Sequence, residues 1–289
     1  MNQTSDNQKT GDSGRSIGAI LIDNGRLSPE AAERIIKLQK DKGLRFGDAA
    51  IQLGLVSATD IEKALSHQYD YPYLTSSSQV SETLVAAFKP FSPVVEQLRA
   101  LRSQLMLRWF GNDSANKALA VVSPESREGR SFVAANLAVV FSQLGERTLL
   151  IDADLRNPVQ HRFFGLNNKQ GLSSVLAGRS SRDEAAIRIP DLMNLTVLSA
   201  GPQAPNPLEL LSRPQFSALL AQSGEDFDIV IIDTPPAAPT ADAQTICART
   251  RGALIVARRD ISQAASLRRM TQSLQQDGVH LVGTLLNNG

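Results

Sequence analysis

The stretch ALAVVSPESREGRSFVAANLAVVFSQLG (residues 118–145) decides the fold of this chain. Its pattern is a short apolar strand, a polar loop and an apolar helix, and further apolar runs follow, separated by helical patterns. These runs are TLLIDAD, LTVLSA, FDIVIID, ALIVAR and HLVGTLL. Strands this apolar are expected to be buried on both faces of a mostly parallel sheet. The sequence therefore predicts a doubly wound α/β domain that binds ligands beyond the carboxyl ends of its strands.

The loop after the first of these strands has features of a phosphate-binding loop. It ends in Gly-Arg-Ser at the start of a helix, where backbone N–H groups and the helix N-terminus attract phosphate. Compared with the pattern G-x-x-x-x-G-K-[ST], Pro124 replaces the first glycine and Arg130 replaces the lysine. Gly129 and Ser131 are kept. This match is weak by itself and needs support from other parts of the chain.

Two further strand ends carry carboxylates. Asp152 and Asp154 follow the run TLLI within D-x-D-x-R, and Asp233 follows the run DIVII within D-T-P-P. Any one of them alone could be a loop cap. Carboxylates at strand ends opposite a serine at a helix N-terminus, however, are the hard oxygen ligands that Mg²⁺ on a polyphosphate requires. The three features in this order predict a nucleotide site.

Composition excludes several other classes of protein. The 289 residues carry a net charge of +1, which argues against a bulk nucleic-acid binder held by phosphate neutralisation. A single cysteine, Cys247, excludes an internal disulfide framework and a cysteine-based zinc site, and it fits a reducing, cytoplasmic compartment. No apolar run approaches the roughly 20 residues that span a bilayer. We therefore expect no direct membrane insertion, and any membrane association has to come through a partner.

The region before the α/β domain contains a repeat. The segments IGAILIDNGRLSPEAAERIIKLQ, from Ile17, and FGDAAIQLGLVSATDIEKALSHQ, from Phe46, align without a gap. The alignment pairs Gly18 with Gly47, Gly25 with Gly54, Ser28 with Ser57, and Gln39 with Gln68. In each unit a short helix ends at a glycine and a serine caps the next helix.

These patterns divide the chain into four parts. Residues 1–16 contain no apolar side chain after Met1 and are expected to form a disordered tail. A small helical domain is predicted over residues 17–75, and a linker rich in serine and proline over residues 76–93. The nucleotide-binding domain is predicted over residues 94–289.

The start of the last part is a helix with regularly spaced charges. In VVEQLRALRSQLMLRW, Glu96, Arg99 and Arg102 recur every three residues and share one face. From the residues alone, a solvated face with an internal ion pair is the simpler interpretation.

The N-terminal repeat resembles the N-terminal domain of type II secretion and pilus assembly ATPases, the MshEN-like family. Tandem units of that family can bind cyclic di-GMP. The resemblance implies a ligand site that includes Arg45, Gly47 and Gln68 from the second unit, with Gly18 and Gln39 from the first. Ser16 stands where the first unit should have its arginine. A docking module for another protein, without ligand, is the alternative.

The motif order of the α/β part resembles that of bacterial tyrosine kinases, P-loop proteins related to the MinD and ParA ATPases. In that family D-x-D-x-R is a second Walker-type motif and D-T-P-P is Walker B. An E-x-x-R-x-x-R helix used in ring assembly precedes the catalytic domain, and Glu96, Arg99 and Arg102 match it. With the N-terminal repeat, the chain is similar to tyrosine kinases of the EpsG type, which are associated with chain-length determinant proteins in exopolysaccharide synthesis.

The resemblance implies roles for single residues. Ser131 and Asp152 would hold Mg²⁺, and Asp233 would bind its water shell. Asp154 would accept the tyrosine hydroxyl proton or orient that hydroxyl, and Arg130 would contact the β- and γ-phosphates of ATP. The residues implied to bind the nucleotide are Ser126, Arg127, Glu128, Gly129, Arg130, Ser131, Phe132 and Asp233. Arginine presents a larger, planar fork than lysine, so we expect weak turnover.

Two functions follow from this resemblance. One is a protein-tyrosine kinase that regulates exopolysaccharide polymerisation, export and chain length, activated by a membrane-embedded co-polymerase and assembled as a homo-oligomer. Such a kinase would be cytoplasmic and peripheral to the inner membrane through that partner. The other is a weakly active MinD-like ATPase or nucleotide-binding adaptor on the export machinery. The tyrosines available for autophosphorylation are Tyr69, Tyr71 and Tyr73, which could instead serve only in packing.

Overall fold

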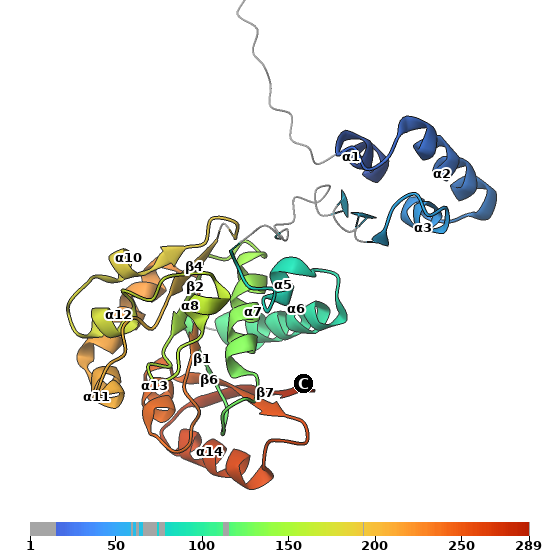
Figure 1. The fold of residues 1–289 in the computed structure, drawn as a ribbon. Coiled ribbons are helices and arrows are strands. Elements are labelled where there is room, and N and C mark those ends of the chain that lie inside the picture. The colour runs from blue at the N-terminus through green and yellow to red at the C-terminus, as the bar shows by residue number, and fades with distance from the viewer. Residues whose placement is uncertain are drawn as a thin grey trace, which may run out of the picture. The chain divides into compact units, whose positions relative to one another are not determined.

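The computed structural model describes residues 16–58, 60–61, 64–65, 74, 79–111, 116–192 and 194–288. The chain forms two compact units, Met1–Pro72 and Tyr73–Gly289 (Figure 1). Gln68, Tyr69, Tyr71 and Tyr73 lie outside the described residues, as do residues 76–78 of the predicted linker.

The first unit contains the helices α1 (Ile17–Asp23), α2 (Pro29–Lys42) and α3 (Phe46–Gln52). The repeat is visible in its backbone. Gly25 and Gly54 adopt left-handed φ angles of 66° and 64°, which glycine accommodates without a steric penalty. Ser28 caps α2 by accepting a hydrogen bond from Ala31 N, while Ser57 and Asp60 cap the following turn reciprocally. A small core of buried aliphatic residues from both halves, including Ile35, Ala49 and Ile61, holds the unit together.

The second unit is built on a seven-stranded sheet of order β3-β4-β2-β5-β1-β6-β7. Its strands are β1 (Ala118–Val122), β2 (Thr148–Asp152), β3 (Ile187–Arg188), β4 (Leu195–Leu198), β5 (Ile229–Asp233), β6 (Gly252–Arg258) and β7 (His280–Asn287). All neighbouring strands are parallel except β3 and β4. This confirms the predicted mostly parallel sheet and adds β3, a two-residue edge strand too short to show a sequence pattern.

Helices cover both faces of the sheet (Figure 1). The first of them along the chain are α5 (Val85–Phe88), α6 (Pro93–Leu105), the π-helical turn η1 (Met106–Phe110) and α7 (Arg130–Ser142). The others are α8 (Gln160–Phe163), α9 (Leu172–Leu176), α10 (Arg182–Ala185), α11 (Pro207–Ser212), α12 (Pro214–Asp226), α13 (Asp242–Thr250) and α14 (Ala264–Gln276).

The alternation of side chains along the strands divides the core in two. On β1, Leu119 and Val121 pack with α5, α6 and α7, whereas Ala120 and Val122 pack with α9, α11, α12, α13 and α14. Cys247 lies in the second cluster, and burial raises the pKa of its thiol to about 12. Because helices cover both faces of the sheet, polar side chains of the strands can reach a ligand only at the strand ends. The candidate site is therefore expected at the carboxyl ends of the strands.

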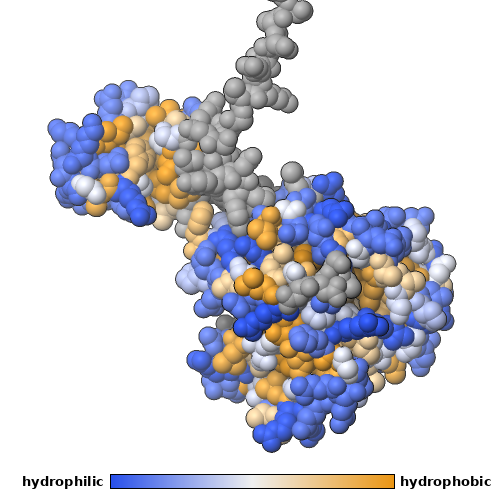
Figure 2. All heavy atoms as spheres, turned by 180° about the vertical axis from the view of Figure 1, so that it is seen from behind, coloured by the Kyte–Doolittle hydropathy of each residue, from blue (hydrophilic) through white to orange (hydrophobic). Residues whose placement is uncertain are grey.

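Within the described part of the chain, no helix combines the length and the apolarity needed to cross a membrane. On the face drawn in Figure 2, hydrophobic side chains form separate patches among hydrophilic ones.

Candidate functional site

The phosphate loop leaves the carboxyl end of β1 and leads into α7. Arg127 and Gly129 adopt left-handed backbone conformations, with φ angles of 63° and 95°, and Gly129 is the residue before the first turn of α7. A Cβ atom at position 129 would lie 2.2 Å from Nδ2 of Asn287. The backbone angle therefore favours glycine at this position, and a Cβ there would also displace the Asn287 side chain that donates to Glu128 O.

Glu128 braces this loop from inside. Its carboxylate is fully buried and accepts hydrogen bonds from Glu125 N at 2.8 Å and from the hydroxyl of Ser262. Its carbonyl accepts from Nδ2 of Asn287 at 3.1 Å. The loop conformation thus depends on residues that lie more than a hundred positions later in the chain. No local sequence pattern indicated these contacts.

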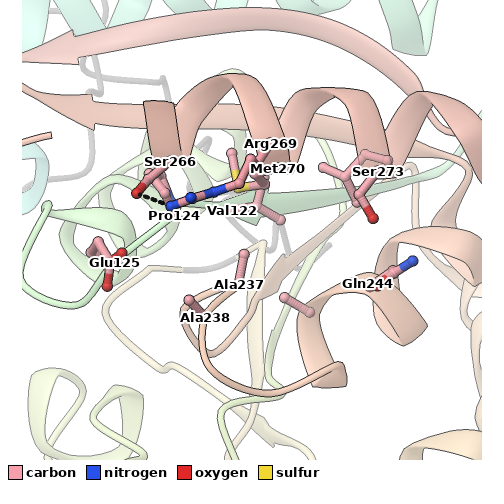
Figure 3. Close-up of a pocket in the computed structure, with 12 residues that line it drawn as sticks. Val122, Pro124, Glu125, Ala237, Ala238, Gln244, Ser266, Arg269, Met270 and Ser273 are labelled. Carbon is pink, nitrogen blue, oxygen red and sulfur yellow. Dashed lines mark hydrogen bonds between the residues drawn. The ribbon is translucent and has the colours of Figure 1, made fainter. Parts of the chain in front are cut away.

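The segment after β5 supports the other side of the loop. Ala237 N donates to Ser123 O at 2.9 Å, and Ala238 N donates to Pro124 O at 3.1 Å. Beside these bonds lies a cavity of about 220 Å³ whose lining includes Ala237, Ala238 and Pro124, together with Arg269 and Met270 of α14 (Figure 3). The segment that follows D-T-P-P is therefore hydrogen-bonded to the start of the phosphate loop.

The strand register brings the predicted carboxylates together. Asp152 at the end of β2 is the direct partner of Asp233 at the end of β5, and Asp233 is also the partner of Val121 on β1. Asp154 follows two residues after Asp152. All three carboxylates are buried, with exposed fractions of 0%, 4% and 0% for Asp152, Asp154 and Asp233.

Arg130, in the lysine position of the motif, points into this acidic cluster. Its guanidinium donates to Ser123 Oγ at 2.8 Å and to Asp154 Oδ2 at 3.4 Å, and its Nε lies 3.4 Å from Asp233 Oδ1. The side chain is 8% exposed. Arg130 therefore provides the positive charge that compensates two of the three carboxylates in this state of the protein.

The electrostatics of the cluster favour a bound cation. Burial and then repulsion from Asp233 hold the pKa of Asp152 well above the usual aspartate range. Burial also raises the pKa of Asp233, while Arg130 and the hydrogen bonds from Gln160 and Ser131 lower it. A divalent cation would remove the penalty of ionising both carboxylates in a buried place.

The donor set fits Mg²⁺. Asp152, Asp233 and Ser131 supply the carboxylate and hydroxyl oxygens that this ion prefers. Oδ1 of Asp233 is buried and accepts no hydrogen bond from the described residues beyond its long ion-pair contact with Arg130, which leaves it able to accept from a water of a hydrated cation. The five predicted residues Arg130, Ser131, Asp152, Asp154 and Asp233 are thus brought to one place.

Gln160, at the start of α8, is a site residue that the motifs did not indicate. Its backbone N–H donates to Asp152 Oδ2 at 3.0 Å. Its side-chain nitrogen donates to Asp233 Oδ2 at 2.8 Å and to Ser131 O at 3.1 Å. The only signal available in the sequence was its place a few residues after D-x-D-x-R.

The arginine of D-x-D-x-R points away from the acidic cluster. Arg156 forms a two-pronged ion pair with Asp242 at the start of α13, at 2.6 and 3.3 Å. The hydrogen bond with Asp242 raises the pKa of Arg156. Asp154 Oδ1 accepts from Arg156 N and Asn157 N at 3.2 and 2.9 Å, which fixes the orientation of its carboxylate. Arg156 therefore ties the loop after β2 to α13.

The charged residues of α6 divide between two environments. Glu96 and Arg99 form an ion pair on the helix surface, whereas Arg102 donates from Nη1 to Val140 O of α7 at 2.7 Å. The expected common face thus includes one residue that also anchors α6 to α7.

The residues implied in cyclic di-GMP binding have mixed surroundings. Arg45 is exposed and precedes α3. Gly18 and Gly47 lie against Phe46 and Ile61, where an added Cβ would approach to 3.1 Å. Gln39 is half-buried. The two glycines therefore have a packing role within the repeat.

Comparison with known sequences places the chain among nucleotide-binding proteins and kinases. Residues 114–288 match the ParA family, described as NUBPL iron-transfer P-loop NTPase. The putative tyrosine-protein kinase CapB of Staphylococcus aureus is 33% identical over 69% of this chain and 86% of its own length. The tyrosine-protein kinase YwqD of Bacillus subtilis (strain 168) is 36% identical over 73% and 87%. Some relatives are much longer: the chain spans 28% of the tyrosine-protein kinase etk of Escherichia coli (strain K12).

Solved structures agree with the sequence comparison. The chimerical protein CapA2B2 has a TM-score of 0.67 and 34% identity, covering 78% of this chain and 98% of that one. The kinase domain of Escherichia coli tyrosine kinase ETK has a TM-score of 0.68 and 33% identity, covering 71% and 79%. The cell division ATPase MinD of Pyrococcus furiosus shares the fold, with a TM-score of 0.52, 24% identity and coverage of 59% and 71%. With its converging phosphate loop and acidic cluster, the chain belongs to the family of bacterial tyrosine-protein kinases, which are built on a ParA-like P-loop fold.

Proposed function

We propose that this chain is an ATP-dependent protein-tyrosine kinase that regulates the polymerisation, export and chain length of an exopolysaccharide. The observation that carries the proposal is the convergence of Ser131, Asp152, Asp154 and Asp233 beside a phosphate loop, at the start of α7, at the ends of β2 and β5, and in the loop that follows β2. This arrangement suits phosphoryl transfer, which depends on positioning and on stabilising charge.

Each group of the site has a separate role in the proposed phosphoryl transfer. Backbone N–H groups at the start of α7 would hold the phosphates. Ser131, Asp152 and Asp233 would hold Mg²⁺, which supplies positive charge to the phosphates and orients them. Arg130 would exchange its contacts with Asp154 and Asp233 for the β- and γ-phosphates. Asp154, released from Arg130 but still fixed by two backbone N–H groups, would accept the proton of the tyrosine hydroxyl.

Exchange of contacts at Arg130 supports the expectation of weak turnover. The guanidinium has to leave a buried position between two carboxylates before it can meet a phosphate. Its five donors form a planar fork, whereas lysine presents a compact charge on a flexible stem. We infer that the activity depends on an activator, and that the cytoplasmic segment of a membrane-embedded co-polymerase is this partner.

Assembly and location follow from the same proposal. We infer that α6, through Glu96, Arg99 and Arg102, contributes to a homo-oligomer, and that the protein is cytoplasmic and held at the inner membrane by its partner. The N-terminal repeat is proposed to be a docking module. Calorimetric titration of the full chain with cyclic di-GMP, beside Arg45→Ala, tests the ligand-binding alternative. Heat that disappears in the variant would support a ligand site.

The kinase proposal is tested by incubating the full chain with ATP, Mg²⁺ and the partner's cytoplasmic segment, and measuring phosphotyrosine. We expect phosphotyrosine in the wild type and its loss in Asp154→Ala. Phosphate release without phosphotyrosine in either protein would favour a MinD-like ATPase switch.

A further inference from the structure

We propose that Gln160 is a positioning residue of the metal–nucleotide site, whose side-chain nitrogen fixes Asp233 and the phosphate loop and whose side-chain oxygen accepts a hydrogen bond from a water of the magnesium shell. The inference rests on the proposed nucleotide-dependent function and adds to it a residue outside the motifs. It concerns a residue that is fully buried although it is polar.

Gln160 connects all three motifs of the site. Its backbone N–H binds the carboxylate of Asp152, and its side-chain nitrogen binds both the carboxylate of Asp233 and the carbonyl of Ser131. The three distances are 3.0, 2.8 and 3.1 Å. A side chain that joins the two strand-end carboxylates to the first turn of α7 sets their relative positions.

The orientation of the amide follows from its neighbours. Asp233 Oδ2 and Ser131 O are both acceptors, so the nitrogen has to face them and the oxygen has to face away. This oxygen, Oε1, is buried and has no hydrogen-bond partner among the described residues. Buried acceptors are rarely left without a partner, and such an atom calls for an explanation by a water or ion.

Two other buried atoms of the site, Asp233 Oδ1 and Arg130 Nε, lack a hydrogen bond but form an ion pair with each other at 3.4 Å. Gln160 Oε1 has neither kind of partner among the described residues, and an ordered water is the partner that such a buried acceptor needs. Mg²⁺ keeps several of its waters in protein sites, so a buried acceptor beside its carboxylate ligands has a defined use.

The choice of glutamine at this position is explained by charge. Asp152, Asp154 and Asp233 already place three carboxylates in a buried region. A glutamate would add a fourth and would lose the donor that Asp233 accepts from. An aliphatic side chain would leave Asp233 Oδ2 without this donor. Glutamine is neutral and offers a donor to the protein and an acceptor to the water.

The test is a calorimetric titration of the full chain with ADP, in the presence and absence of Mg²⁺. Gln160→Met keeps the volume and removes both hydrogen-bonding groups. Mg²⁺ increases the ADP affinity of the wild type by a certain factor, and we expect this factor to be about tenfold smaller in Gln160→Met. Tenfold is the lower end of the effect of losing an outer-shell partner. Because Gln160 also holds the carbonyl of Ser131, the metal-free ADP affinity of each variant is measured as the reference for this gain. A Mg²⁺-dependent gain equal to that of the wild type would overturn the proposal.

Gln143→Met is the matched control. Gln143 is half-buried and, like Gln160, donates from its side-chain nitrogen to a backbone carbonyl, that of Ala86, at 2.9 Å. It lies at the far end of α7 from the phosphate loop. This variant should keep the full Mg²⁺-dependent gain. The fluorescence of Trp109, the single tryptophan of the chain, checks that each variant is folded.

Gln160→Glu separates the role of the oxygen from simple scaffolding. It keeps an acceptor but loses the donor to Asp233. If the oxygen serves a metal-bound water, this variant should keep more of the Mg²⁺-dependent gain than Gln160→Met, while its metal-free ADP affinity falls through repulsion. An equal loss of the gain in both variants would refute the acceptor role. Because the readout is binding, absence of phosphotyrosine in the wild type would reject the kinase proposal without affecting this one.

Discussion

Replacing Arg130 by methionine should destabilise the nucleotide-free protein. The substitution removes the guanidinium that contacts Asp154 and Asp233 from a position that is 8% exposed. Removing one partner of a buried ion pair costs about 3–5 kcal/mol, because the other charge is left uncompensated. The two contacts are long, at 3.4 Å, and Asp233 can take up a proton, so we expect a loss near the lower value.

The loss of stability in Arg130→Met should depend on pH, and this dependence identifies its cause. Burial already raises the pKa of Asp233 in the folded state, and Arg130 opposes that rise. In the variant the folded-state pKa moves higher still above the unfolded value. A group of this kind contributes stability below its unfolded pKa, and the contribution is lost as pH rises through the folded pKa. The deficit of Arg130→Met should therefore be largest at neutral pH and shrink as pH falls toward the ordinary aspartate range.

Urea unfolding followed by Trp109 fluorescence measures this effect. Trp109 is the only tryptophan, is buried, and stacks on His280, so its emission reports on the nucleotide-binding unit. Arg130→Lys keeps the charge but lacks the fork that reaches Ser123, Asp154 and Asp233 together, and it should fall between wild type and Arg130→Met. Equal stability of wild type and Arg130→Met at neutral pH would refute the view that Arg130 compensates the cluster.

Two further predictions concern the loop and the metal site. Gly129→Ala should lose nucleotide binding, because position 129 has a positive φ and an added Cβ meets Asn287 at 2.2 Å, whereas Gly178→Ala, with a similar φ and open space, should lose only about 1 kcal/mol of stability. Equal ADP affinity of the two variants would contradict this. The pKa of Asp152 is raised, so Mg²⁺–ADP binding should strengthen as pH rises above the ordinary aspartate range and should release protons. Calorimetry in two buffers of different ionisation enthalpy detects that release, and its absence would show that the carboxylates are already ionised.

Residues near the ends of apolar strands were predictable from the sequence. Asp152 and Asp233 each follow a run of apolar residues, and parallel strands of equal register then place them side by side. The start of α7 was likewise indicated by Gly129 and Ser131. These features are local, and the topology of a doubly wound sheet brings the carboxyl ends of the strands that carry them to one edge.

Contacts between distant segments were not predictable. Ser262 and Asn287 brace the phosphate loop from the far end of the chain. Gln160 carries no motif, and its role depends on facing Ser131 and Asp233 across the site. The inward direction of Arg130 depends on its contacts with two acidic residues, Asp154 and Asp233. Such contacts arise from tertiary packing, on which a periodic pattern gives no information.

The fate of the γ-phosphate tests the central claim most directly. The full chain is mixed with Mg²⁺ and ATP labelled at the γ-phosphate, together with the cytoplasmic segment of the co-polymerase proposed as its activator, and the label is located after a single turnover. We predict that the label is found on tyrosine in the wild type and is absent from tyrosine in Asp154→Ala. Label recovered only as inorganic phosphate, in equal amounts from both proteins, would contradict the assignment of this site to tyrosine phosphorylation.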